Sequence, residues 1–239
     1  MTDTLMTPPW ADLAARFRQI WPDRPAPVGW TRVNRIPDGV ELADPARTVS
    51  ACSLWRQGTE RVVALGADHG ACAMGRYTQG FIDELPGDDP TIGAMLEVEY
   101  IDPAEVPSIP HLAVGPVGAV YGPLADFPLD PAAVLVFATP EQAMILAEAL
   151  GLMNADAAGL HVLGRPTCAA IPFAVDVETA TGSVACTGAR LFAGFDPGEM
   201  LVVIPAEQLG GLAERLEAAV RWNAAVAEVG RANLAAVGA

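Results

Sequence analysis

The sequence contains no lysine, because all 14 basic side chains are arginine. This absence excludes a pyridoxal enzyme that holds its cofactor as a Schiff base, a phosphate-binding loop with its Gly-Lys pair, and any lysine general base. The chain also lacks an apolar run of the roughly 18 residues that a membrane helix needs. Residues 1–17 show no basic segment followed by an apolar one, so no secretory signal is expected and the cytoplasm is the expected location.

Positive charge is scarce as well. The 239 residues carry 29 acidic and 14 basic side chains, which gives a formal net charge of −15. A polyphosphate would be repelled by such a field, so nucleic acid is not an expected partner. Apolar residues make up 51% of the chain and charged residues 18%, which is typical of a globular protein with a substantial core.

Hydrophobic periodicity predicts alternating helices and strands along most of the chain. Residues 84–131 differ, because they are rich in proline and glycine and predict strands and connections without a helix of any length. No linker divides the chain. We therefore expect one α+β domain over residues 27–239, a mixed sheet flanked by helices, after a helical extension over residues 1–26. The expected elements are helices over 5–21, 45–57, 140–152 and 206–236, a helix beginning near Cys72, and strands over 27–36, 61–65 and 133–138.

Capping residues predict where two of these helices begin. Asp44 is the expected N-cap of a helix with Pro45 in its first position and Gly58 at its end. This assignment places Cys52 in the middle of that helix. Thr139 is the expected N-cap of the helix that follows the strand over 133–138.

Two stretches of the chain resemble each other. ACAMGRYTQGF (71–81) and ACTGARLFAGF (185–195) share the pattern A-C-x-x-x-R-x-x-x-G-F. Repetition of such a unit indicates an internal pseudo-repeat. We expect pseudo-duplicated halves over about 45–150 and 160–239.

The four cysteines fall into two similarly spaced pairs, Cys52 with Cys72 and Cys168 with Cys186. Four interpretations compete: buried inert thiols, two structural disulfides, which need an oxidising compartment, a single nucleophile, or a shared metal or iron–sulfur site. No C-x-x-C pair is present, so the fold would have to bring dispersed ligands together.

Each repeated stretch places a cysteine at a predicted helix start. The backbone N–H groups and the positive end of the helix dipole favour the thiolate there. Arg76 and Arg190 follow Cys72 and Cys186 by one turn, so they are expected near the sulfur or against an anionic group, with surface salt bridges as the alternative. His69, three residues before Cys72, is a candidate proton donor or ligand, or else a polar loop residue.

Six stretches make the chain similar to the uncharacterised proteins of domain of unknown function 169. They are ACSLWRQG, ADHGACAMGRYTQGF, LVFATPEQAMILAEAL, GRPTCAAIPFAV, SVACTGARLFAGF and MLVVIPAEQL, and they cover about residues 27–220. The resemblance implies cysteines in these same stretches. It also implies a distribution over bacteria and archaea, many of them anaerobes, which is compatible with an oxygen-sensitive cluster. It supplies no substrate.

We therefore expect a cytoplasmic iron–sulfur or metal-binding redox protein in which Cys52, Cys72, Cys168 and Cys186 bind one [4Fe–4S] cluster or a single metal ion. An enzyme of this kind would be a cluster- or metal-dependent oxidoreductase or lyase on a small anionic substrate. Its proton donor would be His69, with the two arginines binding the anionic group. Haem stays an alternative cofactor, although no C-x-x-C-H attachment motif is present.

Two other functions stay open at this stage. One is a small-molecule binding or sensor domain whose cysteines line an apolar pocket, and the other is a thiol enzyme that uses Cys72 with His69. The expected partner is a small-molecule substrate or a redox partner protein, not a nucleic acid or a membrane. The alanine-rich last helix is compatible with a homodimer.

Overall fold

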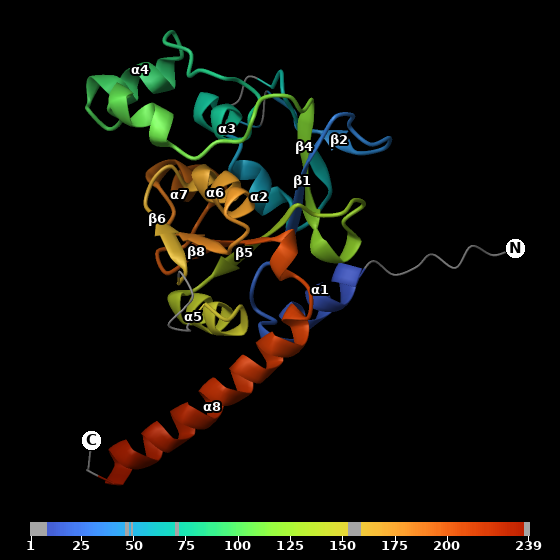
Figure 1. Cartoon of the computed structure of the whole chain (residues 1–239), viewed down its shortest axis with the longest axis vertical. Coiled ribbons are helices and arrows are strands. Elements are labelled where there is room, and N and C mark those ends of the chain that lie inside the picture. The colour runs from blue at the N-terminus through green and yellow to red at the C-terminus, as the bar shows by residue number, and fades with distance from the viewer. Residues whose placement is uncertain (1–8, 46–47, 49, 70–71, 153–158, 237–239) are drawn as a thin grey trace, which may run out of the picture.

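The computed structural model describes residues 9–45, 48, 50–69, 72–152 and 159–236. Within these residues, eight strands form one mixed sheet in the order β2-β3-β4-β1-β5-β8-β7-β6 (Figure 1). Neighbouring strands are antiparallel except for the two edge pairs, β2–β3 and β6–β7, which are parallel. The strands are β1 (Val28–Val33), β2 (Glu41–Leu42), β3 (Val63–Gly66), β4 (Gly118–Pro123), β5 (Ala133–Ala138), β6 (His161–Leu163), β7 (Thr181–Ser183) and β8 (Met200–Pro205). The predicted α+β class with a mixed sheet flanked by helices is confirmed.

The strand order is symmetric about the central pair, β1 and β5. Moving outward from this pair, β4 corresponds to β8, β3 to β7 and β2 to β6. The connecting helices correspond too, because α2 (Ser53–Gln57) and α6 (Ala170–Asp176) follow the edge strands, while α3 (Ala73–Thr78) and α7 (Thr187–Ala193) follow the next strands inward. Internal duplication of the sequence itself stays a prediction. The topology nevertheless gives the helix at each cysteine a counterpart in the other half of the sheet.

Two layers of helices cover the sheet. On one face, α2, α6 and α7 pack on the strands through a core that includes Trp55, Ile171 and Ala189. On the other face, α1 (Pro9–Ile20), α5 (Pro140–Ala149) and the start of α8 (Leu212–Ala236) form a second core with β5 and β8. The central strands are apolar on both faces, as expected for strands buried between two helical layers.

One predicted helix is much shorter than expected. α2 begins at Ser53, and the described residues between Pro45 and Cys52 are turns or irregular backbone. Cys52 is therefore the N-cap of α2 and not a mid-helix residue. The cap signal of Asp44 and Pro45 was misleading, because helix propensity is weak over such a short segment and tertiary packing decides the boundary.

The prediction of no helix over residues 84–131 is wrong. α4 (Pro90–Glu97) lies in this segment, followed by a 3-10 helix, η1 (Pro103–Ser108). Asp89 caps α4 by accepting hydrogen bonds from the backbone N–H groups of Thr91 and Ile92. An Asp-Pro start is a standard helix signal, which the surrounding prolines and glycines concealed.

The predicted start of α5 is confirmed in detail. Thr139 accepts a hydrogen bond from the backbone N–H of Gln142, and the Gln142 side chain accepts one in return from the Thr139 N–H. This reciprocal arrangement is a capping box. The last predicted helix, over 206–236, is divided in two: a short 3-10 helix, η4 (Ala206–Gln208), precedes α8.

Candidate functional site

All four cysteines lie where helices begin, on the same face of the sheet. Cys52, Cys72 and Cys186 are the N-cap residues of α2, α3 and α7. Cys168 lies in a single 3-10 turn, η3 (Thr167–Ala169), which leads directly into α6. The two halves of the sheet therefore contribute one cysteine pair each, and of the three N-cap cysteines Cys72 is the one whose sulfur accepts a hydrogen bond from the backbone of its helix.

Hydrogen bonds link these helix starts across the two halves. The thiol of Cys52 is 2.9 Å from the Ser50 hydroxyl and 3.9 Å from the backbone carbonyl of Gly188, in the first turn of α7. The first cysteine of one half therefore lies against the helix that carries Cys186 of the other half. Contacts between α2 and α7 support the same pairing.

The remaining two cysteines are paired in the corresponding way. The turn η3, which carries Cys168, packs against α3, the helix that Cys72 caps, and Thr78 of α3 is close enough to lower the pKa of Cys168. Both cysteines border the same apolar cluster. Thr167 links the segments of Cys168 and Cys186, because its hydroxyl accepts a hydrogen bond of 2.6 Å from the backbone N–H of Cys186. The four helix starts thus form one connected group.

The backbone at Cys72 has an unusual conformation. Its φ of 43° is in the left-handed region, which residues other than glycine seldom adopt. In this conformation the Cys72 sulfur accepts a hydrogen bond of 3.4 Å from the N–H of Gly75. Such positions cluster at functional sites, where the surrounding structure holds them in place.

The four sulfur atoms are close enough to influence one another electrostatically. Burial raises the pKa of Cys52 to about 12; its hydrogen bond with Ser50 opposes the rise, and charge on Cys72 or Cys186 adds to it. Burial also raises the pKa of Cys168 well above its ordinary value, and charge on any of the other three cysteines raises it further. In the protein alone, Cys52 and Cys168 are therefore neutral thiols at pH 7.

Proximity of the thiols does not amount to a coordination shell. Among the described residues, no group of three or more His, Cys, Asp or Glu side chains is arranged so that it could hold a metal ion. The cysteines are free and form no disulfide. The fold therefore gathers four thiols in one neighbourhood without placing them around a single point.

A buried polar group lies beside the thiols. Tyr121, on β4, donates a hydrogen bond of 2.6 Å to the side-chain oxygen of Gln79, and the Trp30 indole N–H donates to the same oxygen at 3.3 Å. Burial is the main cause that raises the pKa of Tyr121, and charge on Cys168 or Cys52 raises it further. No sequence pattern identifies this group, because its members come from separate elements and no motif joins them.

The segment over residues 90–109, which we call the cover, lies over two of the cysteines. Ile92 and Ile101 of the cover form an apolar cluster with Tyr77 of α3, and the cluster borders Cys72 and Cys168. Figure 1 shows α4 on the outer side of α3. Apolar side chains thus cover this pair of thiols in part, and both cysteines stay partly exposed.

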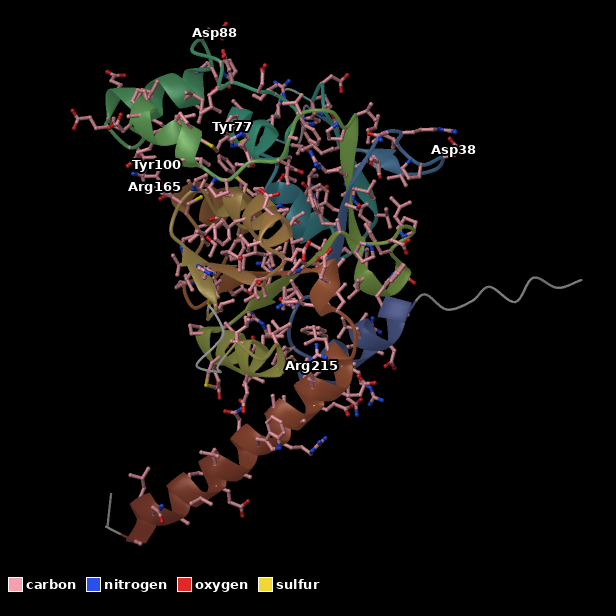
Figure 2. All side chains as sticks on the ribbon, in the orientation of Figure 1. Asp38, Tyr77, Asp88, Tyr100, Arg165 and Arg215 are labelled. Carbon is pink, nitrogen blue, oxygen red and sulfur yellow. The ribbon has the colours of Figure 1, made fainter. Side chains whose placement is uncertain are left out.

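Arg165, close to Cys168 in the sequence, fastens the cover to the rest of the molecule. Its guanidinium donates a hydrogen bond to the backbone carbonyl of Tyr100 and lies 4.7 Å from the centre of the Tyr100 ring (Figure 2). A further contact of 3.6 Å joins it to Glu105. These contacts tie the cover to the turn that leads into η3.

The two predicted site arginines bind backbone carbonyls. Arg76 donates a hydrogen bond of 3.2 Å to Ala67, in the loop before Cys72. Arg190 donates to Val184, just before Cys186, at 2.7 Å, and to Asp196 at 3.0 Å. Each guanidinium therefore ties its helix to the chain on the N-terminal side of the cysteine.

His69 is buried, with only 7% of its surface exposed. Its backbone N–H donates to the carbonyl of Gly66, which places it in the turn after β3. Its predicted role as proton donor or ligand stays a prediction, and so does the binding of an anion by the two arginines.

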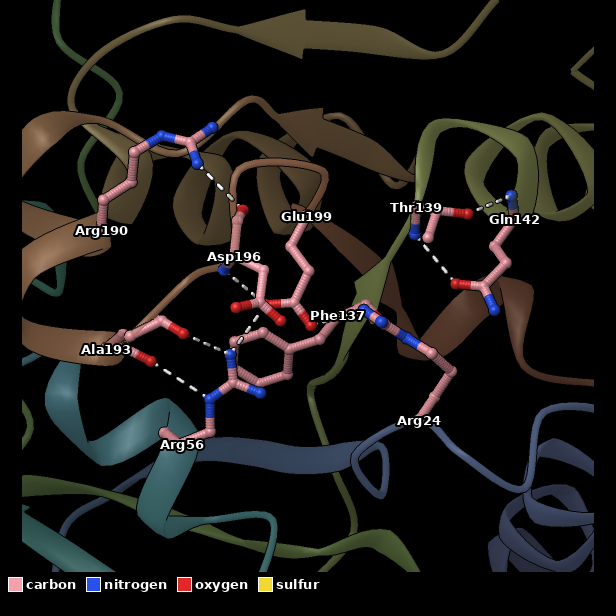
Figure 3. Close-up of polar contacts among 10 residues, drawn as sticks. Arg24, Arg56, Phe137, Thr139, Gln142, Arg190, Ala193, Asp196 and Glu199 are labelled. Carbon is pink, nitrogen blue, oxygen red and sulfur yellow. Dashed lines mark hydrogen bonds and ion pairs between the residues drawn. The ribbon is translucent and has the colours of Figure 1, made fainter.

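Arg56, near the end of α2, ties this helix to the end of α7. It donates hydrogen bonds of 3.1 and 3.0 Å to the carbonyls of Ala193 and Gly194 (Figure 3). Its guanidinium lies 4.0 Å from the centre of the Phe137 ring. The helix that begins at Cys52 is thereby held against the helix that begins at Cys186.

Glu199 holds Arg56 in this position. Its buried carboxylate is 2.9 Å from the Arg56 guanidinium and 2.5 Å from that of Arg24, and it accepts a hydrogen bond of 3.0 Å from the Asp196 N–H. Burial by itself would raise the pKa of Glu199, but the Asp196 N–H and the two arginines together lower it below its ordinary value. No sequence pattern pointed to this ionised group.

A hollow of about 170 Å³ lies away from the cysteines, between α1 and β5. Arg18, Trp21, Arg24 and Phe137 are among the residues that line it. No helix in the described part of the chain is both long and apolar enough to cross a membrane.

A single known family matches the part of the chain that contains all eight strands. The family described as Uncharacterised ArCR, domain of unknown function 169, matches residues 24–215, which include all four cysteines. The chain is also similar to "Uncharacterized protein MJ0308" of Methanocaldococcus jannaschii, with 27% identity over 196 residues, 76% of this chain and 81% of that protein. No solved structure matches the chain. The chain therefore belongs to the domain of unknown function 169 family, as the resemblance of its cysteine-bearing stretches indicated.

Proposed function

We propose that this protein is an iron–sulfur or metal-binding redox protein whose cofactor is held by Cys52, Cys72, Cys168 and Cys186. One observation carries the proposal: the pKa of Cys168 responds to charge on each of the other three cysteines, so the four thiols share one neighbourhood. Dispersed cysteines that the fold gathers in this way can share one bound metal centre.

A cubane cluster fits this neighbourhood better than a single ion does. A single ion needs all its ligands around one point, whereas a cluster places each thiolate on a separate iron atom and so holds the sulfurs further apart. The four helix starts supply N–H groups that can donate hydrogen bonds to cluster sulfur. Such hydrogen bonds and the apolar surroundings are known to set the potential of a cluster.

The raised pKa values of Cys52 and Cys168 mean that these thiols would ionise at neutral pH only beside a cationic ligand. Two neutral thiols in apolar surroundings need a positive charge nearby before they can ionise at neutral pH. A bound metal centre supplies that charge and deprotonates its thiol ligands. In the proposal, Arg76 and Arg190 act as positioning residues, because they fasten the segments before Cys72 and Cys186.

The proposed location is the cytoplasm, where thiols stay reduced. A substrate, if there is one, would be a small anionic molecule with His69 as the proposed proton donor. A small-molecule binding domain is the second candidate function. The hollow lined by Arg18, Trp21 and Phe137 supports it, because a cationic group beside aromatic rings suits a small anion with an apolar body.

Anaerobic purification tests the main proposal. We expect a coloured protein with about four irons and four sulfides per chain, as for a cubane held by four thiolates. Single Cys→Ser variants at the four positions should each lose at least half of the bound iron. The matched control is Met144→Ser, which removes an exposed sulfur on α5 and should bind iron like the wild type.

Circular dichroism and thermal unfolding show whether each cysteine variant is folded. A folded wild-type protein that stays colourless and iron-free after anaerobic reconstitution with iron and sulfide would overturn the cluster. Binding of one zinc ion per chain, lost in all four variants, would support the single-ion form of the proposal instead.

A further inference from the structure

Only the first part of α8 packs against the rest of the protein. Leu212, Ala213, Leu216 and Ala219 are buried, and α8 contacts α5 and α1. Beyond Asn223 every residue of the helix is exposed, and Figure 1 shows this part projecting from the body. A helical segment without tertiary contacts has little stability of its own in water, so a partner would stabilise this part of α8.

The projecting part carries an apolar stripe. Trp222, Val226 and Val229 are 57%, 71% and 61% exposed, respectively. Their spacing of four and then three residues is that of a coiled-coil seam. At about 100° per residue, the three side chains lie within roughly 60° of one another around the helix.

Two charges border the stripe on one side. Arg221 and Glu228 are seven residues apart, so they lie within roughly 20° of one another around the helix. Neither forms an ion pair within the described part of the chain. An antiparallel pair of identical helices brings the same flank of each together, so Arg221 of one copy meets Glu228 of the other, twice. In a parallel pair the same flanks lie on opposite sides of the seam, so Arg221 and Glu228 would not meet across it.

The same antiparallel register aligns the apolar stripe. With the two-fold axis near residue 224, Trp222 of one helix packs against Val226 of the other. The end of the second helix then runs along a hollow of about 340 Å³ at the base of α8. This hollow is lined by Trp222, Arg215 and residues 148–151.

Net charge favours contact at this place. The chain as a whole carries −15, so two copies repel each other over most of their surface. Residues 220–236 carry two arginines and one glutamate, a net charge of +1. The projecting helix is therefore a surface where two copies can approach without repulsion.

We propose that the exposed part of α8 pairs antiparallel with the same helix of a second copy of this chain. The resulting two-fold dimer buries Trp222, Val226 and Val229 and joins Arg221 to Glu228 across the axis. The proposal is independent of the cysteines and of any cofactor.

Sedimentation of the full-length protein over a range of concentrations tests the dimer. We expect a mass of about twice the 24.9 kDa of one chain. Val226→Glu should raise the dissociation constant at least about tenfold, because it buries a carboxylate in the seam. Val98→Glu is the matched control, since Val98 is 72% exposed in a different element and should leave the dimer intact.

A charge exchange tests the antiparallel register. Arg221→Glu alone sets two carboxylates against each other at both ends of the seam and should weaken the dimer. Combining it with Glu228→Arg should restore the wild-type dissociation constant. A wild-type monomer at all concentrations, a dimer that survives Val226→Glu, or no restoration in the double variant would each overturn the proposal. All these side chains are exposed, and unchanged thermal unfolding of the monomer confirms that the variants fold.

Discussion

At the scale of single residues, burial has more influence than the helix-start position on whether the Cys52 thiol is ionised. A cysteine at a helix start is expected to ionise readily, yet burial raises the pKa of Cys52 to about 12. Desolvation of the charged form outweighs the helix dipole there, because the sulfur lies within the core that contains Trp55.

Thiol labelling of the metal-free protein tests this conclusion. At pH 8, a pKa of about 12 in place of 9.0 lowers the thiolate population of Cys52 by about a thousandfold. We therefore expect iodoacetamide to modify Cys52 about a thousand times more slowly in the folded protein than in urea. Peptide mapping by mass spectrometry measures the rate, with the partly exposed Cys72 as internal comparison. Equal rates in both states would contradict the burial of this thiol.

Gly75 allows two cysteine-bearing segments to approach each other. A Cβ atom at this position would lie 2.6 Å from the Cβ of Ala51 and 3.7 Å from the sulfur of Cys72. We expect Gly75→Ala to lower the free energy of unfolding by about 1–3 kcal/mol, the usual cost of overpacking a core. In the proposed cluster protein it should also reduce bound iron.

A glycine in an open position is the control for that substitution. A Cβ atom added at Gly93, within α4, would meet no side chain and no other segment within 4 Å. Gly93→Ala should therefore raise the free energy of unfolding by up to about 1 kcal/mol, because alanine favours the helix. Urea unfolding measures both variants, and equal effects at the two glycines would show that packing at Gly75 is unimportant.

At the scale of elements, the site depends on how α2 is fastened to α7. Arg56 bonds to the last carbonyls of α7, and Glu199 holds Arg56 and Arg24 by charge. A short helix such as α2 has little stability of its own, so these tertiary contacts fix its position. The position of Cys52 depends on the same contacts.

Glu199→Gln tests the importance of this ionised group. We expect a loss of about 2 kcal/mol in the free energy of unfolding at pH 7, because both arginines lose a charged hydrogen-bond acceptor. The matched control is Glu41→Gln, at an exposed pair with Arg61, which should change stability by less than about 0.5 kcal/mol. A similar loss in both variants would contradict a special role for Glu199.

The lowered pKa of Glu199 also predicts a dependence on pH. A carboxylate whose pKa falls on folding stabilises the protein above its unfolded pKa, and this stabilisation is lost as the pH falls through the folded value. Urea unfolding should therefore show that the difference between wild type and Glu199→Gln is constant above the ordinary pKa of 4.5 and shrinks below it. A difference that grows on acidification would contradict the lowered pKa.

At the scale of the whole molecule, residues far apart in the chain enclose the thiols. The cover, over residues 90–109, interrupts the first half of the sheet between α3 and β4, and Arg165 of the second half fastens it. The site is therefore completed only when both halves are in place.

Arg165→Ala tests the attachment of the cover. The substitution removes the contacts to Tyr100 and Glu105, so we expect faster hydrogen exchange in residues 90–109 and faster labelling of Cys72. Arg35→Ala is the control, because this exposed arginine pairs with Asp38, only three residues away. Unchanged exchange in the cover after Arg165→Ala would show that apolar packing alone holds it.

Features of this fold that depend on neighbouring residues were predictable from the sequence, and those that depend on distant residues were not. The capping box at Thr139 and the strand over 133–138 were predictable, because both depend on neighbouring residues. Cys52 was placed wrongly, and α4 was missed, because packing against distant segments decides whether such short helices form. Neither Glu199 nor Tyr121 could be identified, since their partners are distant in the sequence.

The sequence by itself determined the fold class, the family and the residue types available for chemistry: four cysteines, no lysine and a strongly acidic composition. These properties follow from composition, periodicity and local motifs, which need no knowledge of long-range contacts. Only the tertiary structure decided that the four thiols share one neighbourhood, that burial keeps two of them neutral, and that the end of α8 projects into solvent. The reason is physical: desolvation and charge interactions depend on distance in space, and the folding of the sheet brings together residues that are more than 100 positions apart in the chain, such as Cys52 and Gly188.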